Sequence, residues 1–288
     1  MDGPALMSEE EGLGRGHAFR YAHSLSRPSG TLSRKREREQ DTRHTMSTGK
    51  EHIIKSYDDE LTRLTGELVR MGELAVSQLE AAIDVVERRD ERAAQHVVGN
   101  DDAIDQLEQE ISHDVVRLLA LRAPMAGDLR NVFAALRIAA DIERIGDYAA
   151  NVAKRSIPLS MAAPINPTSG LAHLAELAAA EVRGVLRAYR DRDAERAYQV
   201  WEDDVELDDA YTGYFRQLLT YMMEDPRNIT PCTHLLFMAK NIERIGDHAT
   251  NIAESVWYQV TGEPLTAQRA KRDLTASPEL PKLGDRGD

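Results

Sequence analysis

Residues 142–147 read Ile-Glu-Arg-Ile-Gly-Asp, and residues 242–247 repeat the same six letters in the same order. The identity continues at three of the next six positions, so nine of the thirteen residues from 141 to 153 match their counterparts 100 positions later. Most of the matching residues are polar, and one is a glycine inside a helical pattern. Duplication of a core alone would preserve mainly apolar residues, so this repeat predicts a duplicated site as well as a duplicated fold.

Apolar residues on both sides of the repeat recur in steps of three and four, which predicts amphipathic helices. Short turns at 124–127 and 225–228 make neighbouring helices antiparallel. Three prolines between 158 and 167 mark a linker between the two halves. The predicted helices cover approximately residues 61–86, 101–122, 128–156, 171–189, 207–221 and 235–256.

The segments follow the same order in both halves. We therefore predict an all-α fold of two tandem three-helix bundles, at residues 55–157 and 168–261, related by internal duplication. Residues 1–45 contain several glycines and a charged run without apolar periodicity, and are predicted to be a disordered N-terminal extension. Residues 262–288 contain three prolines and are predicted to be a disordered tail.

The composition excludes some classes of protein. A net charge of −13 argues against non-specific binding to nucleic acid or anionic lipid, which needs a basic surface, although an acidic surface also serves solubility alone. The single cysteine, Cys232, cannot form a disulfide within the chain, which is typical of a reducing compartment. No apolar run is long enough for a membrane helix and no signal-peptide pattern is present, so we expect a cytoplasmic protein.

Four acidic residues of the first half are expected to meet across a helical hairpin. Glu143 and Asp147 are four residues apart and share one helix face, as do Asp101 and Asp105 on the preceding helix. With the turn centred near residue 125, residue 105 lies level with about residue 145, because both helices rise ~1.5 Å per residue. The two acidic pairs are therefore predicted to lie at one height on facing helices.

The second half repeats the arrangement, with Asp204 and Asp208 opposite Glu243 and Asp247. Two like charges ~4 Å apart repel by about 4 kcal/mol at an effective dielectric constant near 20. A bound cation removes this repulsion, and ligands that are all oxygen suit Mg²⁺, Mn²⁺, Ca²⁺ or iron better than tetrahedral zinc. We therefore predict metal sites formed by these four residues and by the four of the first half.

Two other interpretations of the acidic residues stay open. They form a solvated acidic face, or Arg144 and Arg244 neutralise them in place of a metal. Gly146 and Gly246 require an explanation, because a glycine within a helix destabilises it by about 1 kcal/mol relative to alanine. Close approach of two helices and room for a ligand are equally good reasons.

The remaining polar residues give weaker signals. His248, which replaces the tyrosine of the first copy, is interpreted mainly as a surface histidine and otherwise as a ligand of the second site. Asn151 and Asn251 are candidates for hydrogen bonds to metal-bound water. Glu110 and His113 form a Glu-x-x-His pair without a counterpart in the second half, so we interpret them as helix surface.

The sequence contains no nucleophile with a paired base and no glycine-rich phosphate loop, so we do not expect an enzyme. The alternative is a metal-dependent phosphohydrolase in which two metals activate water at the carboxylates. A third possibility is a scaffold that binds no metal.

The motif Glu-Arg-Ile-Gly-Asp at 143–147, its copy at 243–247, and Ala-Pro-Met-Ala-Gly-Asp-Leu-Arg at 123–130 resemble the PhoU family. These are accessory proteins of the phosphate-specific transport system. The resemblance spans about residues 55–261 and both repeats. The first 45 residues have no counterpart in most members of the family.

This resemblance implies a fold of two three-helix bundles and a cytoplasmic protein that is commonly a homodimer. It implies a negative regulator of the phosphate regulon that modulates phosphate uptake. Such a protein is an adaptor between the phosphate transporter, through its ATPase PstB, and the sensor histidine kinase PhoR. Some members bind clusters of iron or other ions through paired acidic motifs. In this chain, the motifs correspond to Asp101, Asp105, Glu143, Asp147, Asp204, Asp208, Glu243 and Asp247.

Overall fold

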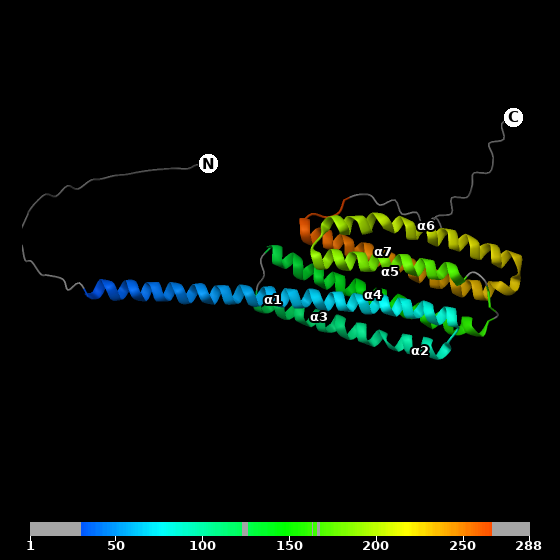
Figure 1. Ribbon diagram of the computed structural model, residues 1–288, viewed down its shortest axis with the longest axis horizontal. Helices are drawn as coiled ribbons and strands as arrows, with labels where there is room; N and C mark the ends of the chain where they lie inside the picture. The colour runs from blue at the N-terminus through cyan, green and yellow to red at the C-terminus, as the bar shows by residue number, and fades with distance from the viewer. Residues whose placement is uncertain (1–29, 123–125, 163, 166–167, 267–288) are drawn as a thin grey trace, which may run out of the picture. The chain divides into compact units, whose positions relative to one another are not determined.

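The computed structural model describes residues 30–122, 126–162, 164–165 and 168–266, and within them the chain is helical and forms no strand (Figure 1). The all-α prediction is therefore confirmed. The helices are α1 (Gly30–Arg88), α2 (Glu91–Gly99), α3 (Asp101–Arg122), α4 (Ala126–Met161), α5 (Thr168–Asp191), α6 (Ala194–Glu224) and α7 (Ile229–Thr261), with a short 3-10 helix, η1 (Pro226–Asn228), before α7.

The start of α1 differs from the prediction of disorder over residues 1–45. The residues before Gly30 lie outside the described part of the chain, and α1 is helical from Gly30 onward. The run 34–40 consists of arginine, lysine, glutamate and glutamine, whose intrinsic propensity favours a helix even without an apolar stripe. The described residues up to Ile53 belong to one unit, and the described residues from Ile54 belong to a second unit that carries the candidate sites.

The C-terminal end of α7 is defined by Gly262, which adopts a left-handed φ of 79° as many helix-terminating glycines do. The predicted tail, 262–288, lies mostly outside the described residues, which end at Thr266. Within the described part, Leu265 packs against the core. Among the described helices, none is both long and apolar enough to cross a lipid bilayer.

The first connection of each repeat has the same local structure. Arg89 and Arg192 adopt left-handed φ angles of 57° and 53°, at a cost of about 1–3 kcal/mol for residues with a side chain. Asp90 and Asp193 follow them as N-caps, and each carboxylate accepts a hydrogen bond of 3.0 Å from the backbone N–H three residues later. The duplication therefore extends to this turn, although the sequence comparison did not detect it.

The second helix of each repeat starts earlier than predicted. The helix predicted from 101 to 122 matches α3, but the separate helix α2 precedes it, with Asn100 between them. In the second repeat, α6 is continuous from Ala194. Within α2 only Ala94 and Val97 are buried, so its apolar stripe is too short to be recognised by periodicity.

The predicted linker begins later than expected, because Pro158 lies inside α4 rather than beyond its end. A proline in a helix removes one backbone hydrogen bond and crowds the preceding turn. The terminal carbonyl groups of α4 are instead satisfied by the Arg89 guanidinium, which donates to Leu159 O at 3.0 Å, to Ser160 O at 2.8 Å and to Ala162 O. This interaction holds the last turn of α4 against the connection that follows α1.

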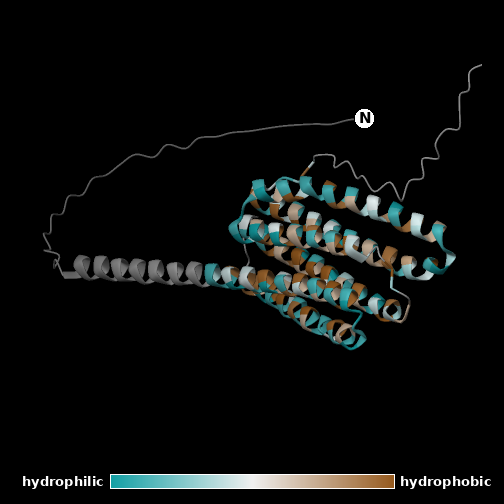
Figure 2. Ribbon diagram, turned by 45° about the vertical axis from the view of Figure 1, so that its right-hand side comes forward, coloured by the Kyte–Doolittle hydropathy of each residue, from teal (hydrophilic) through white to brown (hydrophobic). Residues whose placement is uncertain are grey.

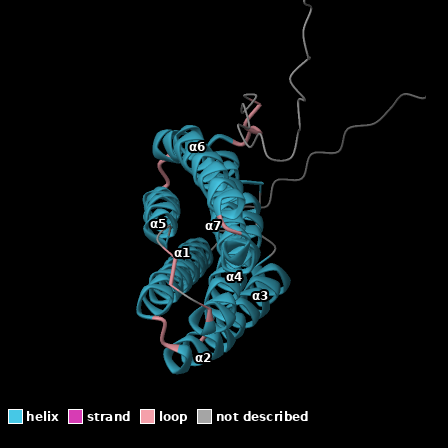
Figure 3. Ribbon diagram, turned by 90° about the vertical axis from the view of Figure 1, so that its right-hand side faces the viewer, coloured by secondary structure: helices cyan, strands magenta, loops and turns pink. Residues whose placement is uncertain are grey.

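The centre of the fold is the antiparallel pair α4 and α7. Their direction follows from contacts at opposite ends, where Gln259 Nε2 donates to Asn131 Oδ1 at 3.2 Å and Arg155 stacks on the ring of Phe237. α2 and α3 pack on α4, and α5 and α6 pack on α7, as the end-on view in Figure 3 shows. Each of these helices carries both hydrophobic and hydrophilic residues (Figure 2), as expected for amphipathic helices that pack through one face.

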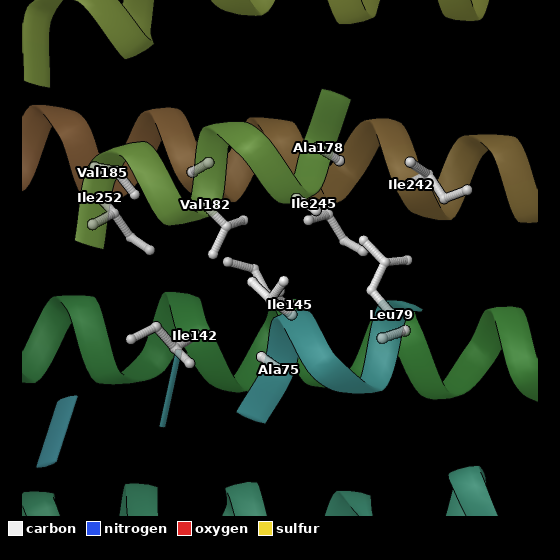
Figure 4. Packing of buried hydrophobic residues seen from close by; sticks show 14 of the residues in the cluster. Ala75, Leu79, Ile142, Ile145, Ala178, Val182, Val185, Ile242, Ile245 and Ile252 are labelled. Atoms are coloured by element: carbon white, nitrogen blue, oxygen red, sulfur yellow. The ribbon is translucent and has the colours of Figure 1, made fainter. Parts of the chain in front are cut away.

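Both repeats share one hydrophobic core. Figure 4 shows isoleucines of α4 and α7 beside small and branched residues of α1 and α5. Burying such a side chain fully stabilises the fold by about 1.5–3 kcal/mol. The labelled core residues are Ala75, Leu79, Ile142, Ile145, Ala178, Val182, Val185, Ile242, Ile245 and Ile252.

We predict that Arg89→Ala lowers the free energy of unfolding by about 1–3 kcal/mol, because three carbonyl groups at the end of α4 lose a charged donor. The matched control is Arg88→Ala. Arg88 is exposed and pairs with Asp84 one turn earlier, so its loss should change stability by less than about 0.5 kcal/mol. Urea denaturation followed by circular dichroism compares the two variants, and equal effects would contradict the capping role.

Candidate metal centre: two carboxylate clusters

The glycine of the first repeated motif brings α3 into close contact with α4. A Cβ atom added to Gly146 would lie 2.8 Å from Ile104 Cδ1 and 3.3 Å from Asp101 Oδ1. Because real Cβ atoms do not approach so closely, only glycine allows α3 this position without a rearrangement. The contact confirms close helix approach as one reason for the glycine, and it also places a carboxylate against α4.

The second motif makes the corresponding contact with α6. A Cβ atom on Gly246 would lie 2.4 Å from Leu207 Cδ2 and 2.8 Å from Asp204 Oδ1. A third group is present here, because Glu181 Oε2 of α5 would lie 3.0 Å from the same Cβ position. The hairpin registers predicted from the sequence therefore bring the expected helices together in both repeats.

The four acidic residues of the first repeat act on each other electrostatically. Burial raises the pKa of the Asp101 carboxyl above its ordinary value, a hydrogen bond from Gln78 lowers it, and the charges of Asp147 and Asp105 raise it further. Burial also raises the pKa of Glu143, where Asp147 and Asp105 again add to the increase and Arg144 opposes it. The structure thus groups Asp101, Asp105, Glu143 and Asp147; we call them the first carboxylate cluster.

Arg144 neutralises part of this cluster. Its Nε lies 3.4 Å from Glu143 Oε2, and one of its terminal nitrogens lies 2.9 Å from Asp147 Oδ2. The guanidinium is 57% exposed, so each ion pair stabilises the fold by no more than about 1 kcal/mol. In the first repeat, Arg144 therefore neutralises two of the four carboxylates, as the interpretation without a metal predicts.

The second carboxylate cluster, Asp204, Asp208, Glu243 and Asp247, is buried more deeply. Asp204, Asp208 and Glu243 are only 1%, 3% and 4% exposed, whereas their counterparts in the first cluster are half-buried. Asp247 is half-buried one turn beyond Glu243 on α7. Lys240 Nζ lies 2.8 Å from Glu243 Oε1 and offsets one of the charges.

The arginine of the second motif has a different environment from that of the first. The guanidinium of Arg244 lies 5.6 Å from the centre of the Tyr148 ring on α4. The same motif position therefore contacts carboxylates in one repeat and an aromatic ring in the other.

Sequence reasoning missed one residue in each cluster. Gln78 of α1 is 5% exposed, and its Nε2 donates to Asp101 Oδ1 at 3.3 Å. Glu181 of α5 is 8% exposed and lies beside Asp204 at Gly246. Gln78 and Glu181 are 103 residues apart, the offset that also relates Asp101 to Asp204. The sequence does contain a signal for these two residues. Each is a polar residue within the apolar stripe of the first helix of its repeat, and the two are separated by the same offset of 103.

The donor chemistry of the clusters suits a hard cation, since every candidate ligand is an oxygen atom. Gln78 Oε1 is buried and has no hydrogen-bond partner, a situation that costs about 1–3 kcal/mol. However, within the described residues no three Asp, Glu, His or Cys side chains are placed to hold an ion together. An ion at either cluster would therefore require these side chains to rotate toward it.

The position of His248 corrects its interpretation as a surface residue. His248 Nδ1 lies 2.8 Å from Asp141 Oδ1, and the two side chains are only 20% and 16% exposed. Asn251 Nδ2 donates to the same oxygen at 3.4 Å. These residues join α7 to α4, so His248 and Asn251 serve the contact between the repeats. Glu110 and His113 line an open surface depression, as expected for a helix surface.

The family model described as "PhoU domain" matches residues 68–156 and again residues 171–256. The chain belongs to the PhoU family. Each matched segment contains one complete carboxylate cluster and its additional residue from the first helix. The two PhoU matches also confirm that the fold is an internal duplication.

Individual PhoU relatives agree with this result. A "Phosphate-specific transport system accessory protein PhoU homolog" from Xylella fastidiosa (strain 9a5c) is 62% identical over 229 residues, which cover 80% of this chain and 97% of the relative. A protein of the same name from Caulobacter vibrioides is 50% identical and covers 78% and 98%. The crystal structure of PhoU from Pseudomonas aeruginosa superposes with a TM-score of 0.68 at 37% identity and covers 72% of this chain and all of the other.

We predict that Gly246→Ala destabilises the protein by about 1–3 kcal/mol, because the new methyl group overpacks the buried side chains of Leu207 and Asp204. The matched control is Gly213→Ala on α6, where no atom lies within 4 Å of the new methyl group. That substitution should stabilise the protein by up to about 1 kcal/mol through helix propensity. Thermal unfolding distinguishes the two, and a stabilising effect at both positions would refute the close contact at Gly246.

Proposed function

We propose that this chain is a regulatory accessory protein of the phosphate-specific transport system. In this role it represses the phosphate regulon when phosphate is plentiful and modulates phosphate uptake. The observation that carries the proposal is the 62% identity over 97% of the Xylella fastidiosa accessory protein. The matches over both repeats support it, because they include the whole duplicated core and not only one motif.

The proposed mechanism is that of an adaptor in the cytoplasm. The protein contacts the transporter through its ATPase PstB and the sensor histidine kinase PhoR, and it acts as a homodimer. In the part of the chain that the structure describes, both clusters consist of carboxylates with an amide, an arginine or a lysine. Such groups bind cations or partner proteins, whereas covalent catalysis needs a nucleophile with a base beside it.

The proposal includes cation binding at the two carboxylate clusters, with Mg²⁺, Mn²⁺ or iron as the ion. Eight residues supply the carboxylates: Asp101, Asp105, Glu143, Asp147, Asp204, Asp208, Glu243 and Asp247. A cation would remove the repulsion between facing helices and thereby hold α3 to α4 and α6 to α7. Oxygen-only donors and the buried amide oxygen of Gln78 support this part of the proposal.

The alternative, a metal-dependent phosphohydrolase, receives less support. It needs a general acid or base beside the metals. His248 was the candidate for this role, and its Nδ1 lies against Asp141 at the junction of α4 and α7. Purified protein supplied with Mn²⁺ or Fe²⁺ should therefore leave a panel of phosphoesters unchanged, and turnover that depends on the clusters would favour the alternative.

A deletion strain tests the regulatory role. We expect promoters of the phosphate regulon to be active in phosphate-rich medium when the gene is deleted, and a plasmid copy to restore repression. Affinity capture with the tagged protein should recover PstB and PhoR. Normal phosphate uptake and normal promoter control in the deletion strain would refute the proposed function. The stable, folded control variant Gly213→Ala should complement fully, since it changes only an exposed position.

Elemental analysis tests the cation part separately. The joint variant Asp147→Asn and Asp247→Asn removes one carboxylate from each cluster without changing its shape. We expect the purified wild-type protein to contain Mg²⁺, Mn²⁺ or iron and the variant to contain less. The correct ion should also raise the melting temperature of the wild type more than that of the variant, because a ligand that binds only the folded state stabilises it. Equal metal content in both proteins would refute binding at these residues.

A further inference from the structure

The first helices of the two repeats cover one side of the central pair, α4 and α7, and exposed side chains lie on the other. Figure 3 shows α1 and α5 together on the covered side, where they meet the buried isoleucines of Figure 4. On the other side, Phe133 of α4 and Phe237 of α7 are 51% and 50% exposed. We call this side the arginine face, and define it by Phe133, Arg137, Arg144, Arg155, Phe237 and Arg244.

The spacing of these residues places them on one side of each helix. Arg137 follows Phe133 by four residues, and Arg144 follows Arg137 by seven, so the three side chains share one face of α4. Arg244 follows Phe237 by seven residues on α7. Arg137, Arg144 and Arg244 are all exposed.

Contacts across the junction of α4 and α7 join the two sets into one row. The guanidinium of Arg155 lies 4.1 Å from the centre of the Phe237 ring, and that of Arg244 lies 5.6 Å from the centre of the Tyr148 ring. Arginines therefore follow one another at the levels of residues 137, 144, 148 and 155 of α4. The two phenylalanines mark the ends of the row. The row extends from residue 133 to residue 155 of α4, or about 33 Å at a rise of ~1.5 Å per residue.

The row presents positive charge although the chain as a whole is acidic. Asp141, which lies between Arg137 and Arg144 in the sequence, is only 16% exposed and is bound by His248 and Asn251. Arg144 takes part in the ion pairs of the first cluster, but its side chain is still 57% exposed. A guanidinium has five N–H donors, so Arg144 retains donors for a further partner.

The chemistry of the face selects among possible occupants. Arginine and aromatic residues together are typical of protein-binding surfaces. A second copy of the chain would bring these arginines against their own counterparts, and like charges that face each other disfavour a complex. A nucleic acid would be repelled by the net charge of −13. A protein segment rich in carboxylates fits best, because a guanidinium binds a carboxylate through two parallel hydrogen bonds.

We propose that the arginine face docks an acidic helix of a partner protein. The carboxylates of that helix lie along the row of arginines, and its apolar side chains lie against Phe133 and Phe237. Carboxylates seven residues apart on such a helix match Arg137 and Arg144, which have the same spacing. A helix of about 20 residues is long enough to span the whole row. This inference assigns a surface to the adaptor role and rests on that role, but it does not depend on cation binding.

Photo-crosslinking in cells tests which molecule occupies the face. A benzophenone amino acid in place of Phe133 or Phe237 in the full-length chain should form a product with an acidic segment of another protein, which mass spectrometry locates. Leu74 on α1, which is 37% exposed, is the control position and should not give this product. Three results would overturn the inference: a neutral or basic partner segment, a product within this chain or with a second copy, or no product at either position.

Substitution of two exposed arginines tests the role of charge. Arg137→Gln combined with Arg244→Gln should lower the yield of the cross-link by on the order of tenfold or more, because two charge-assisted contacts with the partner are lost. As the only copy in the deletion strain, this variant should leave promoters of the phosphate regulon active in phosphate-rich medium. The matched control is Arg70→Gln combined with Arg187→Gln, which removes two exposed arginines from α1 and α5 and should leave both readouts unchanged. Circular dichroism and the melting temperature check that both variants fold.

The same strains separate failure of the inference from failure of the proposed function. If the wild-type gene does not restore repression, the regulatory role itself is refuted. If the wild type and the Arg137 and Arg244 variant repress equally and give equal cross-links, the docking surface is refuted and the regulatory role stands.

Discussion

One close helix contact in each repeat determines the geometry of the clusters. Gly146 of α4 contacts α3, and Gly246 of α7 contacts α6. At this contact Ile104 and Leu207 are almost completely buried against Gly146 and Gly246. A glycine within a helix lowers the stability of the folded state by about 1 kcal/mol relative to alanine, and each repeat contains one at this position. In return, the helices approach closely enough for a buried aliphatic side chain and a carboxylate to lie against the same turn of helix.

The shared core provides the stability that this arrangement requires. Two carboxylates at ~4 Å repel by about 4 kcal/mol at an effective dielectric constant of 20, and each cluster contains at least four. Ile142, Ile145, Ile242 and Ile245 belong to the same two motifs as the acidic residues and are fully buried in the core. Each contributes about 1.5–3 kcal/mol, which offsets repulsion between the acidic residues.

The sequence was sufficient for most of the helices, for the duplication and for the hairpin registers, because these follow from periodicity and helix rise, but it missed α2 and the early start of α6. It was not sufficient where tertiary contacts override local rules. Pro158 lies inside α4, and the carbonyl groups at the end of this helix accept hydrogen bonds from Arg89, which is far away in the chain. Gln78 and Glu181 reach the clusters from helices that periodicity alone cannot place. His248 is half-buried through its contact with the other repeat, which no pattern within its own helix reveals.

The two repeats have kept the same arrangement of helices and diverged in their polar contacts. Asp141 binds His248 of the other repeat, but its own counterpart is an asparagine and the counterpart of His248 is Tyr148. Arg144 contacts carboxylates, whereas Arg244 contacts an aromatic ring. The apolar core requires both copies to remain alike, since a change in one helix must fit its neighbours. The polar contacts around the clusters have changed within this shared core, so the two copies differ in their charged neighbours.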